Sequence, residues 1–241
     1  MRLLTVTIAL LLITATAPAQ AGFFDTFKRL LTSESADTGA PPDENTTIAA
    51  LREALTVGTR NAVHNVARVD GYLGNEWIKI VLPERVQRLA DMAAAVGFQE
   101  QVDHLVVTMN RAAETAAPAA ADLFVTAIGE MTFEDARGIL EGGETSATDF
   151  FRRKTTTRLY AAFKPVVTTS MEQVGVARAY KEVVAPLSSV PMLQTEGLDL
   201  DHYVTNEALD GLFLMVAEEE RKIRSDPAAR VTDLLRRVFG Q

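Results

Sequence analysis

The residues best placed to do chemistry in this sequence are charged side chains on the apolar faces of predicted helices. Glu220 falls on the apolar stripe of a helix predicted for residues 205–224. A buried carboxylate without a partner is costly, so we expect Glu220 to form an ion pair. Arg224 lies four residues on, at the favourable spacing within a helix, and Arg152 is the second candidate partner.

Other polar residues are grouped with this pair as one candidate polar cluster. Its members come from four predicted helices: Asn110, Arg111, Glu114, Asp135, Asp149, Arg152, Glu220 and Arg224. These side chains either form a structural ion-pair network or line a cleft in which carboxylates and arginines do chemistry. We favour the structural interpretation, because such networks are common in proteins without serving a reaction.

The usual catalytic and cofactor motifs are missing from the sequence. There is no cysteine and no G-x-S-x-G motif, and the three histidines lie in unrelated segments. There is no H-x-x-x-H, Glu-x-x-His, EF-hand or phosphate-binding loop pattern either. We therefore predict no metal and no cofactor. The net charge of −8 argues against a nucleic-acid binder, which would show a basic stripe.

A helical corner at residues 131–154 is expected to position much of this cluster. Thr132 and Asp135 have the spacing of a capping box for one helix, and Ser146 and Asp149 repeat that spacing for the next. We expect Gly142 or Gly143 to adopt the left-handed conformation that ends the first of these helices.

The rest of the chain predicts an all-α fold. Apolar periodicity and capping signals indicate a compact helical bundle of nine or ten helices, in one domain that covers residues 46–241. Thr205 is expected to cap the long helix that carries Glu220, and Pro165 to cut the helix that begins near residue 147. Residues 77–82 are rich in β-branched side chains, which favours one short extended segment.

The first 21 residues have the pattern of a signal peptide. Arg2 precedes an apolar run, and Ala19-Gln20-Ala21 is a small-x-small cleavage site. We expect cleavage after Ala21 and a periplasmic protein. Residues 22–45 are predicted to form a short amphipathic helix and a linker. Weak contact of that helix with a membrane surface would use its phenylalanines, Phe23, Phe24 and Phe27.

Several motifs resemble those of a known family. They are NRAAETAAP at 110–118, MTFEDARGIL with the following GG at 131–143, ATDFF at 147–151 and FKPVV at 163–167, together with ALREALTVGT at 50–59 and IKIVLP at 78–83. The chain from about residue 46 to 240 resembles the bacterial family called domain of unknown function 4197. One departure is that Phe150 and Phe151 follow ATD, where the family often has a tyrosine. The resemblance implies an exported, helical protein and no activity, cofactor or catalytic residue.

Three functions follow as expectations. The first is a binding or scaffold protein that acts on a partner protein or a small apolar ligand. The second is an enzyme that uses carboxylates and arginines of the polar cluster. The third is a peripheral membrane protein held by the N-terminal helix. A deep apolar pocket would favour ligand binding, and a convergent, solvent-reachable carboxylate pair would favour an enzyme.

Overall fold

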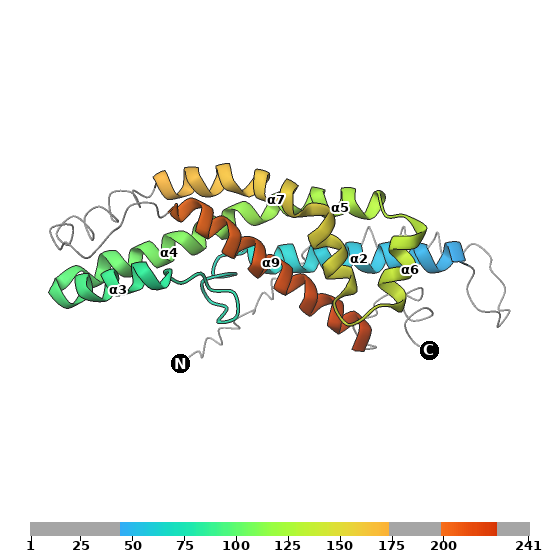
Figure 1. Ribbon diagram of the computed structural model, residues 1–241, viewed down its shortest axis with the longest axis horizontal. Helices are drawn as coiled ribbons and strands as arrows, with labels where there is room; N and C mark the ends of the chain where they lie inside the picture. Colours follow the sequence, from blue (N-terminus) through green and yellow to red (C-terminus); the bar gives the residue numbers. More distant parts are fainter. Residues whose placement is uncertain (1–43, 174–198, 226–241) are drawn as a thin grey trace, which may run out of the picture. The chain divides into compact units, whose positions relative to one another are not determined.

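The computed structural model describes residues 44–173 and 199–225, and the regular elements in these residues are all helices (Figure 1). They are α2 (Glu44–Ala67), α3 (Glu84–Ala93), α4 (Gln99–Ala116), α5 (Ala120–Gly129), α6 (Phe133–Glu141), α7 (Ser146–Gln173) and α9 (Leu200–Ser225). This confirms the predicted all-α class.

The prediction of nine or ten helices was wrong for the part of the chain that is described. The three helices α3, α4 and α5 follow one another with only two short segments between them, Ala94–Phe98 and Ala117–Ala119. The described residues therefore form five helical stretches. The chain bends within Ala94–Phe98, where Gly97 has φ +102°, a conformation that a residue without Cβ adopts freely.

Pro165 does not cut the helix that contains it. It lies inside α7, which continues to Gln173. Phe163, Val167 and Met171 are buried in the core on both sides of the proline, which holds both halves of the helix in place. Pro165 and Ala161 are exposed, so the carbonyl that loses its helical partner faces water, where the loss costs least.

The start of α9 also differs from the prediction. The helix begins at Leu200, and Asp199 rather than Thr205 precedes it. The Asp199 carboxylate accepts the backbone N–H of His202 at 2.8 Å, as a capping residue does. Thr205 is instead buried inside the helix, where its hydroxyl donates to the Asp201 carbonyl at 2.6 Å.

Residues 77–82 form no strand in the structure. Trp77 and Ile78 lie in a turn, and residues 79–83 have no regular structure. The alternation of this segment is nevertheless preserved, because Ile78, Ile80 and Leu82 are buried while Trp77 and Val81 are exposed. The segment thus has the side-chain pattern of a half-buried strand.

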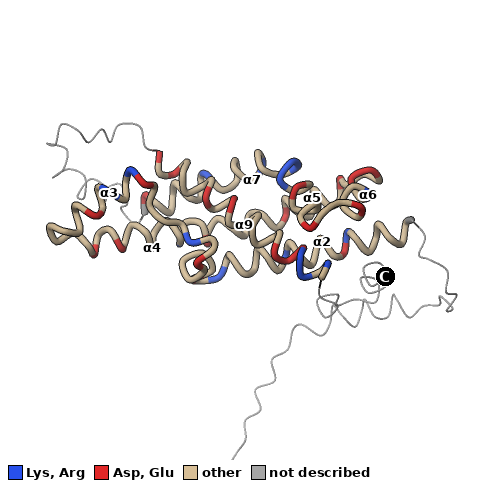
Figure 2. Tube along the Cα trace, turned by 60° about the horizontal axis from the view of Figure 1, so that its bottom comes forward, with Lys and Arg blue, Asp and Glu red and all other residues tan. Residues whose placement is uncertain are grey.

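The core lies where α9 crosses its neighbours. α9 packs against α7 and α2, and α7 also packs against α4 and α5 (Figure 1). Phenylalanines join these helices: the Phe124 ring centroid is 5.0 Å from that of Phe151 and 6.3 Å from that of Phe213, both at edge-on angles. Charged residues of both signs are interspersed along the described helices (Figure 2).

All the described residues belong to one compact unit. The predicted signal peptide, the amphipathic helix with Phe23, Phe24 and Phe27, and the linker lie outside the described residues. So do two helices predicted near the C-terminus, at residues 176–184 and after Asp226.

Candidate functional site

Glu220 caps the start of a helix other than its own. Its side chain is 7% exposed. One carboxylate oxygen accepts the backbone N–H of Ala147 at 2.9 Å, and the other accepts the N–H and the hydroxyl of Thr148, both at 2.8 Å. These amides belong to the first turn of α7, which has no intrahelical acceptor for them. The negative charge also complements the positive end of the α7 dipole.

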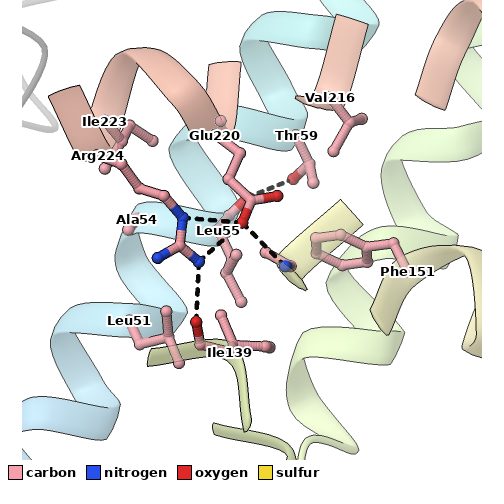
Figure 3. Close-up of a pocket in the computed structure, with 12 residues that line it drawn as sticks. Leu51, Ala54, Leu55, Thr59, Ile139, Phe151, Val216, Glu220, Ile223 and Arg224 are labelled. Carbon is pink, nitrogen blue, oxygen red and sulfur yellow. Dashed lines mark hydrogen bonds and ion pairs between the residues drawn. The ribbon is translucent and has the colours of Figure 1, made fainter. Parts of the chain in front are cut away.

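Arg224 is the ion-pair partner of Glu220, as predicted. Its Nε and one Nη donate to the same carboxylate oxygen at 3.0 and 2.8 Å. That Nη also donates to the carbonyl of Ile139 at 2.8 Å (Figure 3). It donates to the hydroxyl of Ser146 as well, at 2.9 Å. Arg224 thus ties the end of α6 to the start of α7.

The corner between α6 and α7 is only partly as predicted. Thr132 and Asp135 form the predicted capping box. Ser146 was predicted to cap α7 together with Asp149, but its hydroxyl donates to the carbonyl of Ile139 at 2.9 Å. Gly142 ends α6 with φ −82° and ψ −179°, so the left-handed turn predicted for Gly142 or Gly143 does not form. Among the described residues only Gly97 and Asp70 have positive φ.

A small apolar cavity lies beside Glu220. Its volume is about 30 Å³, and its walls come from α2, α6, α7 and α9: Leu51, Ala54, Leu55, Gly58, Thr59, Ile139, Ala147, Phe151, Val216, Glu220, Ile223 and Arg224 (Figure 3). A buried water needs roughly 10–15 Å³ of such space. This cavity therefore has room for about two waters and not for a metabolite.

Asn110 binds the backbone of the non-helical segment that precedes α3. Its side chain is completely buried. Its amide oxygen accepts the N–H of Ile80 at 2.9 Å, and its amide nitrogen donates to the carbonyl of Ile80 at 2.8 Å. The same nitrogen donates to the carbonyl of Val106, one turn earlier in α4, at 2.8 Å.

Glu114 and Arg111 bind the other end of that segment. One carboxylate oxygen of Glu114 accepts the N–H groups of Tyr72 and Leu73, at 3.1 and 3.3 Å. The other pairs with Arg111 at 2.6 Å, and Arg111 also reaches Asp70 at 2.7 Å. Asp70 has φ +63°, a conformation that aspartate tolerates better than most residues.

α9 holds the same segment from a second side. The hydroxyl of Tyr72 donates to the Ala208 carbonyl at 2.6 Å, and that of Tyr203 donates to the Val81 carbonyl at 2.9 Å. Burial, with the negative Glu114 nearby, raises the pKa of Tyr72 far above its usual range, so its hydroxyl stays a donor. We call residues 68–83 the clamped loop, because α4 and α9 both bind it.

The clamped loop presents a large apolar side chain to solvent. Trp77, the single tryptophan of the chain, is 86% exposed. Val69 and Val81 on the same loop are also exposed. Sequence reasoning placed Trp77 in an extended segment and missed its exposure, although the alternation of residues 77–82 was a usable signal.

The remaining members of the predicted cluster lie apart from these two groups. Arg152 pairs with Asp210 at 2.9 Å and stacks 4.6 Å from the Phe213 ring centroid, so it is not the partner of Glu220. Asp135 belongs to the capping box and lies 3.6 Å from Lys154. Burial acts to raise the pKa of Asp135, but the hydrogen bonds from Thr132 and the charge of Lys154 outweigh it and hold this pKa below its usual value. Asp149 is exposed in the first turn of α7.

The structure adds a polar contact between α7 and α9 that sequence reasoning missed. The hydroxyl of Tyr160 lies 2.7 Å from Nδ1 of His202, and the side-chain amide of Asn206 lies 3.0 Å from Nε2 of the same ring. Lys164 binds both oxygens of Asp199 at 3.0 Å. A tyrosine beside an oriented histidine can exchange a proton, but this contact lines neither the cavity beside Glu220 nor the larger one between α2 and α6.

Neither a metal-binding cluster nor a membrane-spanning helix is found among the described residues. No group of three or more His, Cys, Asp or Glu side chains there is placed to hold a metal ion. None of the helices in this part of the chain is both long and apolar enough to cross a membrane.

Comparison with known proteins agrees with the motifs in the sequence. No curated protein and no solved structure matches the chain. A family model described as "Protein of unknown function (DUF4197)" matches residues 42–240, which include the clamped loop, both polar groups and the corner between α6 and α7. The chain therefore belongs to this family of uncharacterised proteins.

Proposed function

We propose that this is an exported binding or scaffold protein that contacts a partner protein through the clamped loop. The observation that carries the proposal is the exposure of Trp77 on a loop whose backbone is bound by buried side chains. Tryptophan is among the residue types enriched as anchors of protein interfaces. A loop whose backbone is held in one conformation before binding loses little entropy when the partner arrives.

Binding is better supported than catalysis. The carboxylate oxygens of Glu220 accept hydrogen bonds from α7 and Arg224, and those of Glu114 accept them from the clamped loop and Arg111. A general acid or base must reach a substrate atom, and these groups are already engaged by the protein. Because charges of both signs are interspersed (Figure 2), apolar contact is the expected attraction.

Site-specific photocrosslinking tests the contact surface. A photoreactive phenylalanine analogue replaces Trp77 in one variant and Val125 in another; Val125 is an exposed apolar residue on α5 and serves as the control. In cells, the variant at position 77 should give a discrete protein adduct that excess wild-type protein suppresses and Trp77→Ala protein does not. The same adducts from both positions, or suppression by both competitors, would contradict the proposal.

Export is a separate part of the proposal and has its own test. The supporting pattern is Arg2, the apolar run and the Ala19-Gln20-Ala21 site. N-terminal sequencing of protein from the periplasm should begin at Gly22. An intact Met1 form in the inner membrane would show that this part is wrong.

Binding of a small apolar ligand is a second candidate, carried by the cavity between α2 and α6. Its volume is about 170 Å³, and it is lined by Thr47, Ile48, Phe133, Arg137, Leu140 and Glu141. The pocket is open to solvent, and Phe133, Arg137 and Glu141 in its wall are exposed. Its apolar side is formed by Ile48 and Leu140, against which a ring of the size of benzene can pack. Benzene should then raise the melting temperature of the wild type and of a Val125→Trp control, but not of Leu140→Trp, which fills the cavity.

A further inference from the structure

We infer that Asn110 is a positioning residue, which acts in place of a neighbouring β-strand to hold the clamped loop and thereby fixes Trp77. The inference deepens the proposed function, since it names the residue that keeps the contact surface in one conformation. The geometry is that of a strand pair. In an antiparallel pair, opposite residues exchange both an N–H and a C=O hydrogen bond, and Asn110 makes both bonds to the single residue Ile80.

Asparagine has the chemistry that this position requires. A carboxamide carries an acceptor oxygen and two N–H donors. Here the oxygen takes the Ile80 N–H, one donor takes the Ile80 carbonyl, and the nitrogen also bonds the Val106 carbonyl on its own helix. Because the amide nitrogen also bonds the Val106 carbonyl, the nitrogen is the end that faces the Ile80 carbonyl and the oxygen is the end that faces the Ile80 N–H. Neither an alanine nor an ionised aspartate at position 110 can reproduce this pairing.

The loop needs such a partner because it has the pattern of a strand and no neighbouring strand among the described residues. Ile80 is 1% exposed, so its backbone groups would be buried without partners if Asn110 were absent, at a substantial cost. The same alternation that buries Ile78 and Ile80 turns Trp77, Lys79 and Val81 outward. The turn at Asn75 holds the start of the outward row, because its side-chain oxygen accepts the N–H of Trp77 and its carbonyl accepts those of Ile78 and Lys79. Releasing Ile80 should therefore leave this turn as the remaining restraint and increase the motion of Trp77.

Time-resolved fluorescence anisotropy tests this directly, because Trp77 is the single tryptophan in the chain. In the wild type the indole, which is 86% exposed, should show a fast local component beside the tumbling of the whole molecule. In Asn110→Asp a carboxylate oxygen faces the carbonyl oxygens of Ile80 and Val106, so the loop should open more often. The amplitude of the fast component should then rise, and the Ile80 amide should exchange its hydrogen about tenfold faster or more. Asn61→Ala, a change at an exposed asparagine on α2, should leave both unchanged.

Acidification supplies a rescue that a general loss of stability would not show. A protonated aspartic acid carries an O–H donor, and burial favours its neutral form. Lowering the pH should therefore reduce the fast component in Asn110→Asp. A wild-type anisotropy decay in this variant, or a fast component that acid does not reduce, would overturn the inference.

Tyr203→Phe keeps the inference testable if Asn110→Asp does not fold. It removes only the hydrogen bond to the Val81 carbonyl, and it should loosen Val81 while Asn110 still holds Ile80 and Trp77. A fast Trp77 component larger in Tyr203→Phe than in the wild type would show that Asn110 does not suffice to fix the loop. If the anisotropy results hold and the crosslinks at position 77 are absent, Asn110 positions the loop but the proposed partner contact is wrong.

Discussion

At the scale of single residues, Glu220 shows how one side chain can stabilise two helices to which it does not belong. Its carboxylate replaces the missing acceptors of the first turn of α7, and through Arg224 it is connected to the last turn of α6. Removing it should leave amides of α7 and the guanidinium of Arg224 without this acceptor. Breaking a buried pair in this way costs about 3–5 kcal/mol, so Glu220→Ala should lower the free energy of unfolding by this amount in denaturant titrations.

The same helix offers a matched control for that prediction. Glu218 pairs with Arg221, but both side chains are 41% exposed, and exposed pairs contribute about 0–1 kcal/mol. Glu218→Ala should therefore change stability little. Glu220→Gln should also destabilise, because its amide N–H₂ would face donors of α7 or Arg224. A wild-type midpoint for both Glu220 variants would contradict the capping role and make Glu220 a functional candidate instead.

Gly142 and Gly143 are adjacent but should respond very differently to substitution. A Cβ on Gly142 would lie 2.5 Å from the Gly138 carbonyl oxygen and 2.6 Å from Cβ of Ser146, whereas a Cβ on Gly143 would meet nothing within 4 Å. Gly142→Ala should therefore cost about 1–3 kcal/mol, as overpacking does. Gly143→Ala should be neutral or stabilise by up to about 1 kcal/mol by restricting the unfolded chain. Equal midpoints for the two variants in urea would show that the corner adapts to the extra atom.

Residues that interact within one helical turn were predictable, and partners distant in sequence were not. Thr132 with Asp135 and Glu220 with Arg224 follow from spacings of three and four residues. The amides of Ala147 and Thr148 lie more than 70 residues from Glu220 in sequence, so only the fold reveals them. Gly142 was recognised as a turn residue for the wrong reason, because close approach to Ser146, and not positive φ, requires it.

At the scale of elements, the start of α9 is fixed by a charged cap. Asp199 accepts the N–H of His202 and binds Lys164 of α7. These hydrogen bonds, the one from His202 first, hold the pKa of Asp199 below its usual value. The ionised carboxylate therefore contributes stability that is present above the unfolded pKa of about 3.9 and is lost as the pH falls through the lower folded value.

Asp199→Asn isolates the charge, because asparagine is also a good capping residue. The variant should be less stable than the wild type near neutral pH, by less than about 1 kcal/mol because the pair is exposed. The difference should vanish as the pH falls below the folded pKa. Lys164→Ala should remove part of the same pH dependence. Thermal melts at several pH values check this, and a difference between Asp199→Asn and the wild type that grows toward low pH would contradict it.

The number and bounds of the helices were less predictable than their class. Apolar periodicity identified every described helix. The effect of Pro165 was over-weighted, because this proline is exposed within α7 and does not end the helix. Whether a proline breaks a helix depends on whether core contacts beyond it, such as those of Val167 and Met171, hold the chain in place. Such contacts come from other helices and are not visible in the local sequence.

At the scale of the whole described domain, α9 is the helix that binds two non-helical segments, the clamped loop and the corner between α6 and α7. Its first half holds the clamped loop through Ala208 and Tyr203, and its second half holds the corner between α6 and α7 through Glu220 and Arg224. Gly211 allows the close approach in the first half, since a Cβ there would lie 2.8 Å from the ring of Tyr72. The hydrogen bonds of α9 to the clamped loop and to the corner use different residues and have no partner in common.

A double-mutant cycle tests whether the polar residues form two separate groups, as the structure places them, or one site. Glu114→Gln and Glu220→Gln should each destabilise, and because the two carboxylates share no partner their effects should add within about 0.5 kcal/mol. Glu220→Gln with Arg224→Gln is the positive control, since these residues are in contact and should show a coupling of about 0.5–3 kcal/mol. Denaturant titrations of the single and double variants give both values. A coupling between Glu114 and Glu220 as large as that of the control would mean that the carboxylates act as one unit, and would restore the single cleft that an enzyme requires.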